Sequence, residues 1–313
     1  MPLDHYVSQV HLKKFYSPAL GDRMYAMRKS DNHAFICKSE DVCRTKDGST
    51  NNYLNEPRLI EEFLLTVEPR YSVALDELRA GKPTSETVYV IAGFIAYIAT
   101  CSPSAMRQCA QPLRAAVEIT ANSLDRTGAF GPTPPDVFGG KSLSELLADG
   151  TLFIDVDNKY PQAIGITSVI DLMSSFGNFR WEVLRNSELD SPFFTSDFPI
   201  AIEQSTDPRI MNRVIPLAPD LAVRIYPENR QERVTDLKFP EFRYTVRTAK
   251  ASEVRAINRL IVQCAETLIF YRDDNPWVRP FVAKHSAFRI EPISDKIPTE
   301  NGTFILNSIR VRR

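Results

Sequence analysis

The stretch from Val88 to Cys101, VYVIAGFIAYIATC, constrains the fold more than any other part of this chain. It contains no charged residue, and apolar side chains run along its whole length. A membrane-spanning helix needs about 20 such residues, so this stretch is too short to cross a bilayer. A helix that is apolar on all sides is typical of a protein core. We therefore expect a buried helix and no membrane-spanning segment.

The residues around this stretch predict further helices. Pro57 follows Asn55 and Glu56, a common way to open a helix. Apolar residues then recur at steps of three and four, the spacing of one helix face; they are Ile60, Phe63, Leu64, Val67 and Tyr71. This helix is expected to end near Gly81. With a further helix predicted over Gln108–Asn122, a helical layer extends from Asn55 to about Asp125.

Strands are predicted on both sides of this layer. Arg23–Met27 and Ala34–Lys38 flank a turn-forming Ser30-Asp31-Asn32 cluster, which predicts an N-terminal β-hairpin. The C-terminal half mixes strands with helices; we expect strands at Phe179–Leu184, on both sides of a bend within Phe193–Ile202, and at Thr303–Val311, with helices at Ala163–Ser175 and Ala251–Ala265. This order favours the α+β class over a regular βαβ repeat.

Residues 130–140, FGPTPPDVFGG, form the best candidate for a domain boundary. A run so rich in proline and glycine sustains neither a helix nor a central strand. It predicts an N-terminal hairpin and helical part over residues 1–129 and a mixed sheet part over residues 141–313. The alternative is a long loop inside one integrated domain.

The charge and the cysteines restrict the class of protein. Basic and acidic residues number 38 and 39, so no global positive field is available to hold a polyanion. The five cysteines include no CxxC pair, which favours free thiols in a reducing compartment. The N-terminus shows no secretory signal pattern. We therefore expect a cytoplasmic protein; its partners and its oligomeric state are open.

The C-terminal stretch carries a local excess of positive charge, which gives nucleic-acid binding as one hypothesis. Its basic residues are Arg279, Lys284, Arg289, Lys296, Arg310, Arg312 and Arg313. A solvated surface is the other interpretation.

Familiar catalytic motifs are absent from the sequence. It has no HExxH, GxSxG, GxxxxGK[ST] or GxGxxG pattern. These absences argue against an ordinary zinc hydrolase, α/β-hydrolase, P-loop NTPase or Rossmann dehydrogenase.

Three features remain as candidates for chemistry. A neutral imidazole at His5 can act as a general base or as a ligand, or can be hydrogen-bonded within the fold. Glu61 and Glu68 lie about 10 Å apart along the predicted helix, too far for a tight pair, so one can line a pocket or both can be solvated. Asp197 precedes Phe198-Pro199 at a bend, where it has either a catalytic or metal-binding role or caps backbone N–H groups.

The chain also resembles a family of bacterial and fungal proteins, the domain-of-unknown-function family numbered 4238. His5-Tyr6-Val7, Gln9, Leu12 and Phe15 are similar to its opening HYVPQ-x-x-L-x-x-F, and Thr195-Ser196-Asp197-Phe198-Pro199 is similar to its TSDxP motif. Further matches follow in the same order along the chain: the hairpin at Arg23–Lys38, Tyr53, Glu61–Glu68, Pro216–Asp220 and Asn258.

Two positions depart from the family pattern. Ser8 replaces the usual proline, which changes only local stiffness, and the region near Cys101 lacks an arginine expected in the long apolar helix. The resemblance implies no settled activity. It does imply that His5, Gln9, Glu68 and Asp197 belong to one site.

Two hypotheses follow. The first is a hydrolase, in its most specific form a metal-dependent nuclease, in which Glu68 and Asp197 hold a divalent metal or a water while His5 transfers protons. Beyond this divalent metal, the sequence leaves the cofactor open. The second is a non-catalytic binding or sensor protein in a bacterial conflict or regulatory system.

Overall fold

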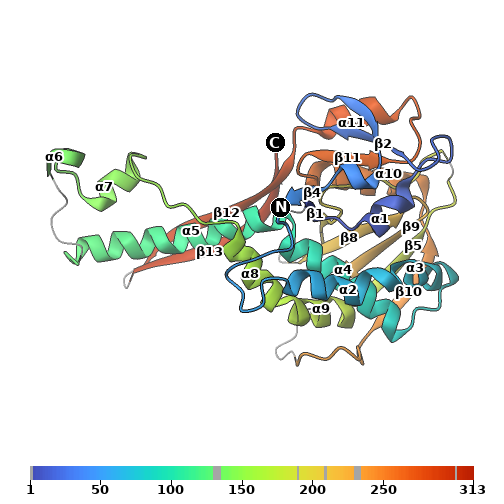
Figure 1. Ribbon diagram of the computed structural model, residues 1–313, viewed down its shortest axis with the longest axis horizontal. Helices are drawn as coiled ribbons and strands as arrows, with labels where there is room; N and C mark the ends of the chain where they lie inside the picture. The colour runs from blue at the N-terminus through green and yellow to red at the C-terminus, as the bar shows by residue number, and fades with distance from the viewer. Residues whose placement is uncertain (1–2, 130–134, 189, 208–209, 229–233, 300–301) are drawn as a thin grey trace.

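The computed structural model describes residues 3–129, 135–188, 190–207, 210–228, 234–299 and 302–313. Two parts of the molecule differ in shape (Figure 1). A body holds the sheets and most helices. An elongated arm projects from it, formed by helix α5 (Pro103–Arg126), the hairpin of β12 (Arg289–Thr299) and β13 (Gly302–Arg312), and the short helices α6 (Pro135–Phe138) and α7 (Leu143–Ala148).

The larger sheet is mostly antiparallel. Its strands, in spatial order, are β10 (Arg243–Thr248), β5 (Arg180–Arg185), β9 (Leu221–Tyr226), β8 (Met211–Ala218) and β7 (Ala201–Gln204). Only the β10–β5 pair among them is parallel. Helices and strands do not alternate regularly, so the α+β class predicted from the sequence is confirmed.

The smaller sheet joins segments that are far apart in the sequence. Its spatial order is β3 (Ala34–Cys37), β2 (Met24–Arg28), β11 (Leu268–Tyr271) and β6 (Thr195–Ser196). The hairpin predicted from the sequence is β2–β3, and Asn32 supplies a positive φ of 56° in its turn. A separate pair, β1 (Leu3–His5) with β4 (Arg44–Lys46), lies near the N-terminus.

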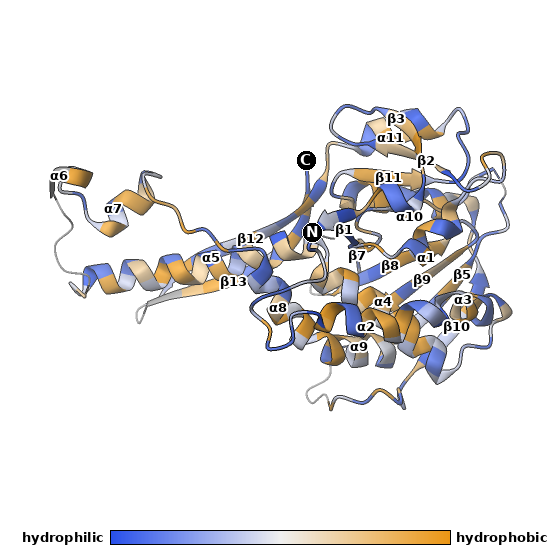
Figure 2. Cartoon of the chain, in the orientation of Figure 1, coloured by the Kyte–Doolittle hydropathy of each residue, from blue (hydrophilic) through white to orange (hydrophobic). Residues whose placement is uncertain are grey.

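The apolar stretch forms helix α4 (Ser85–Cys101) at the centre of the body. Thr84 caps it: its Oγ1 accepts a hydrogen bond from the Thr87 backbone N–H, and the Thr87 hydroxyl lies 2.9 Å from the Thr84 backbone N. Figure 2 shows apolar residues dominating α4, while α5 and the hairpin of the arm mix both kinds. Among the described residues, no single helix is long and apolar enough to span a bilayer, although Leu59–Ala80 and Ser85–Cys101 pass that test as a pair bent by 117°.

The remaining helices cover α4 and the sheets. They are α1 (Gln9–Leu12), α2 (Leu59–Val67), α3 (Tyr71–Ala80), α8 (Lys159–Thr167), α9 (Val169–Asn178), α10 (Ala251–Cys264) and α11 (Val278–His285), with 3-10 turns η1 (Lys13–Phe15), η2 (Ser39–Asp41) and η3 (Glu68–Arg70). Gly81 ends α3 with a φ of 72°, as predicted. The single helix predicted over residues 163–175 is two helices, α8 and α9.

One hydrophobic core serves both sides of the predicted boundary. Buried residues from Val7 to Ile290 form one cluster, and β2 pairs with β11 across the chain. The first half of the proline- and glycine-rich run, residues 130–134, lies outside the described residues, and α6 begins directly after it.

Candidate functional site

A polar pocket near the N-terminus contains three of the four residues that the resemblance groups together. His5, Gln9 and Glu68 line it, together with Asp4 and Glu61. The volume is about 260 Å³. These side chains come from β1, α1, α2 and η3, so distant segments converge here. We call it the His5 pocket.

Backbone contacts hold His5 in place. Strand β1 pairs with β4, which sets His5 opposite Arg44. The Tyr97 hydroxyl on α4 donates a hydrogen bond to the His5 carbonyl oxygen at 3.1 Å. Helix α1 then begins at Gln9, after the extended backbone of Ser8. The turn between them brings the Gln9 side chain back toward the imidazole.

The His5 ring is weakly tethered on one side. Its Nδ1 lies 3.5 Å from Gln9 Nε2, a long contact, while Gln9 Oε1 accepts a hydrogen bond from the Ser39 hydroxyl at 3.3 Å. The Nε2 atom is buried without a hydrogen bond to any described residue. Gln9 therefore orients the ring through Nδ1. Because this contact is weak, Nδ1 of His5 can exchange it for a hydrogen bond to another group.

Burial lowers the pKa of His5 below its ordinary value. Backbone groups of Ser39 and Glu40, and the charge of Glu68, act in the opposite direction, and Arg44 adds to the lowering. The net effect favours the neutral imidazole at pH 7. A neutral imidazole next to carboxylates is chemically suited to accept a proton.

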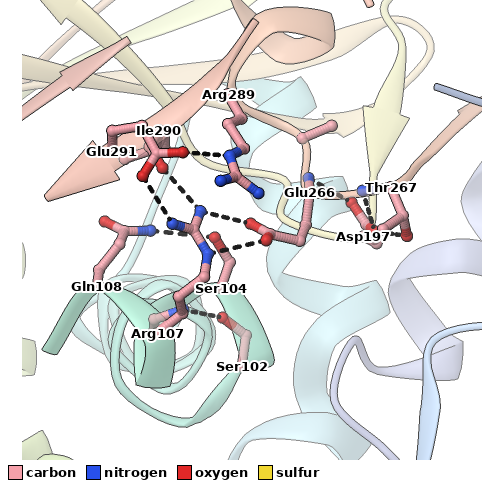
Figure 3. Close-up of polar contacts among 12 residues, drawn as sticks. Ser102, Ser104, Arg107, Gln108, Asp197, Glu266, Thr267, Arg289, Ile290 and Glu291 are labelled. Carbon is pink, nitrogen blue, oxygen red and sulfur yellow. Dashed lines mark hydrogen bonds and ion pairs between the residues drawn. The ribbon is translucent and has the colours of Figure 1, made fainter. Parts of the chain in front are cut away.

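Asp197 occupies a different environment. It follows β6 and is only 2% exposed. Its carboxylate accepts hydrogen bonds from the backbone N–H groups of Glu266, Thr267 and Leu268 at 2.7–3.0 Å and from the Thr267 hydroxyl at 2.6 Å (Figure 3). These are the contacts expected of an aspartate that stabilises a turn. It is not among the described residues that line the His5 pocket.

A protein-held metal ion does not fit the described part of the chain. No group of three or more His, Cys, Asp or Glu side chains lies close enough to hold one there. The carboxylate oxygens of Asp197 already accept four hydrogen bonds, which leaves them poorly placed to bind a metal. We therefore derive no step through a metal.

Sequence reasoning missed an ion-pair network at the base of the arm. Arg107 on α5 forms a two-pronged bond with Glu266, both distances being 2.9 Å, and also pairs with Glu291 at 3.2 Å (Figure 3). Glu266 in turn donates its N–H to Asp197. No local sequence pattern could reveal this network, because Arg107 is far from Glu266 and Glu291 in the sequence.

The basic C-terminal residues are partly neutralised. Arg279 pairs with Asp274, Arg289 with Glu291, and Lys296 with Glu118 on α5. These partners reduce the positive field that a nucleic acid would meet. Ion pairing of this kind suits a solvated surface.

Comparison with known protein families gives one match. Residues 4–275 match the family described as "Protein of unknown function (DUF4238)". No curated protein and no solved structure matches the chain. The matched range contains the His5 pocket and Asp197, whereas α11 and both strands of the arm hairpin follow it.

Proposed function

The chain belongs to the DUF4238 family of proteins of unknown function, and from that premise we propose that it is a hydrolase whose reaction takes place in the His5 pocket. One observation carries the proposal. His5, Gln9 and Glu68 come from β1, α1 and η3, yet they line a single pocket. Polar residues from separate elements that meet in one pocket are the usual arrangement of a catalytic site.

Each residue has a distinct role in the proposed reaction. A water that replaces the weak Gln9 contact gives its proton to Nδ1 of His5 while its oxygen attacks the substrate. Gln9 positions the ring before the attack. Glu68 stabilises the imidazolium that forms, because its negative charge favours the protonated ring. The imidazolium then returns the proton to the leaving group.

The charge of the pocket limits the substrate. Asp4, Glu61 and Glu68 supply carboxylates to it, and Arg58 pairs with Glu61 at its edge. A phosphodiester would be repelled by this negative charge. We therefore propose hydrolysis of an uncharged bond, such as an ester or an amide. Nuclease activity, the more specific form, would require divalent cations to offset the repulsion.

The test compares a catalytic variant with a matched histidine control. The purified chain is assayed on chromogenic ester, amide, glycoside and phosphodiester substrates, with EDTA or with Mg²⁺ and Mn²⁺. His5→Gln should lower kcat by roughly 100-fold or more, the usual contribution of a general base. His33→Gln, in the exposed β2–β3 turn, should leave the rate unchanged. Turnover that survives His5→Gln, or a complete lack of turnover, would overturn the proposal.

A non-catalytic binding or sensor protein is the second candidate. A specific observation favours it, since Nε2 of His5 is closed off from solvent. A sensor of this kind would bind a small ligand in the same pocket without turnover. Saturable binding that leaves the ligand chemically unchanged, measured by calorimetry and mass spectrometry, would support it over the hydrolase.

A further inference from the structure

A second pocket lies where the body meets the arm. The larger sheet, the junction of α4 and α5, and the base of the β12–β13 hairpin enclose it, with a volume of about 510 Å³. Its walls are mainly apolar, with Ala99, Ala105, Pro112, Ile202, Met211 and Ile309 among them. This size is ordinary for a small-molecule site. We call it the Arg213 pocket, after its charged residue, and it shares no residue with the His5 pocket.

Arg213 occupies an unusual place for a charged side chain. On β8 it stands opposite Ile202 of β7 and Ile225 of β9. Cross-strand partners point to the same face of a sheet, so the guanidinium belongs to an apolar face. Burial there lowers the pKa of Arg213. Arg213 is partly exposed and lines the pocket.

No carboxylate neutralises this guanidinium among the described residues. The hydrogen bond of Arg213 goes from its Nη1 to the Met211 carbonyl oxygen at 3.2 Å. The Cys264 thiol would raise the pKa of Arg213 if it were ionised, but burial raises the pKa of that thiol to about 11, so it stays uncharged. The described residues therefore supply no counter-charge to Arg213.

Two other partly buried arginines, Arg224 and Arg107, are neutralised by glutamates. Arg224, on the neighbouring strand, pairs with Glu182, Glu203 and Glu253 at 2.5–2.9 Å. Arg107 pairs with two glutamates. Since a buried charge is costly unless it is paired, the missing carboxylate at Arg213, on the wall of an apolar pocket, calls for an anion from outside the chain.

The pocket also offers neutral polar groups. Gln108, Asn307 and Ser308 line it. The Ser308 hydroxyl is buried without a hydrogen bond to any described residue. A hydroxyl in that state is available to donate to an anion.

We propose that the Arg213 pocket binds a small amphipathic carboxylate, with its carboxylate on Arg213 and its apolar body against the walls. The planar guanidinium fork matches a carboxylate with two parallel hydrogen bonds. Ile202, Met211 and Ile309 cover the apolar part. Ile202, Met211 and Arg213 lie in the range that matches the family. Ser308 and Ile309 lie beyond it.

Cys109 provides a direct readout of occupancy. It lines the pocket and is the exposed one of the five cysteines, all of which are free thiols. Bound ligand should therefore slow its alkylation by iodoacetamide. The four buried cysteines contribute little to the fast phase of that reaction.

The experiment uses three probes of matched length on the full chain: decanoate, decanol and decylamine. Decanoate should bind saturably and slow Cys109 alkylation, decanol should bind at least 10-fold more weakly, and decylamine should not protect. Arg213→Met should weaken decanoate 10- to 100-fold, the range of a lost charged hydrogen bond, with little effect on decanol. Ser308→Ala should weaken decanoate by a smaller factor, because it removes a neutral donor and not a charge.

Two further results decide the proposal even if one variant behaves poorly. Without ligand, Arg213→Met should unfold at the same temperature as the parent chain or higher, because an unpaired buried charge is removed. The control Arg224→Met should lower that temperature, because Glu182, Glu203 and Glu253 all lose the positive charge of Arg224. Equal affinity for decanoate and decanol, or decanoate binding that survives both Arg213→Met and Ser308→Ala, would overturn the proposal.

Discussion

Single residues in this protein divide into those that tie the fold together and those that face a pocket. His11 belongs to the first kind. Its ring nitrogens lie 2.8 Å from the hydroxyls of Tyr71 and Thr195, and its ring stacks on Phe94 with centroids 4.9 Å apart. It thereby joins α1, α3, α4 and β6. Burial lowers its pKa to about 3, so the ring is neutral in the folded protein.

His11 predicts a loss of stability in mild acid. Its pKa is about 6.5 in the unfolded chain and about 3 in the folded one, so its contribution is complete above pH 6.5. That contribution falls by about 1.4 kcal/mol per pH unit from pH 6.5 toward 3. Urea unfolding at pH 7.5, 5.5 and 4.5 should show a clearly smaller pH slope in His11→Phe, at a cost of about 2–3 kcal/mol at pH 7.5. His33→Gln should keep the full slope, and an unchanged slope in His11→Phe would contradict this account.

Substitution of Asp197 should distinguish a structural role from a catalytic one, because a structural aspartate affects stability and a catalytic one affects the rate. An amide in its place would set an NH2 group against backbone N–H donors, so Asp197→Asn should lower the free energy of unfolding by about 2–4 kcal/mol. Chemical denaturation checks this value, with Asp31→Asn in the exposed β2–β3 turn as the control. Full stability combined with lost hydrolysis would instead assign Asp197 a role in the reaction.

The residue scale also shows where sequence reasoning stops. The grouping of His5, Gln9 and Glu68 came from the family resemblance, since their spacing along the chain says nothing about contact. Asp197 joined that group through the same resemblance, but it lies among the N–H groups before β11. Arg213 gave no signal at all, because an arginine in an alternating strand is ordinarily exposed.

At the scale of elements, the sequence predicted the turns and helix ends that depend on a few neighbouring residues. The hairpin β2–β3, the end of α3 at Gly81 and the bend between β6 and β7 all have local causes in turn chemistry. Strand β12 was missed because Pro292 and Pro298 interrupt its sequence pattern. Proline is tolerated there because β12 pairs only with β13, which leaves its other edge open among the described residues.

Two capping boxes offer a matched comparison between body and arm. Thr84 caps α4 in the central core, and Ser142 caps α7 in the arm. Thr84→Ala should lower the free energy of unfolding of the body by about 1 kcal/mol. Ser142→Ala should leave that value unchanged and raise only hydrogen exchange near α7. Equal losses from both variants in the main unfolding transition would contradict this separation.

For the molecule as a whole, the sequence predicted the class but not the shape. The α+β class follows from the order of elements, whereas the projecting arm depends on α5 meeting a hairpin from the other end of the chain. Contacts between segments so far apart produce no periodic pattern of residues in the sequence. The arm also exposes large apolar side chains, among them Val117, Leu124, Phe304 and Leu306.

This shape predicts uneven stability. The body has one continuous core, so fluorescence of buried Trp181 and far-ultraviolet circular dichroism should report one main transition. Outer α5, from Val117 to Arg126, has few buried residues, so its amides should exchange much faster than those of α4. Hydrogen exchange with mass spectrometry measures both. Equal protection along α4 and outer α5 would show that the arm unfolds with the body.

The pairing of β2 with β11 has a consequence for biosynthesis. The ribosome makes residues 24–28 more than 200 residues before their partner at residues 268–271. Until then one edge of the nascent β2–β3 hairpin has no native neighbour, and such an edge invites pairing with other chains. We therefore expect β2 to depend on chaperones or on rapid elongation until residues 268–271 have been made.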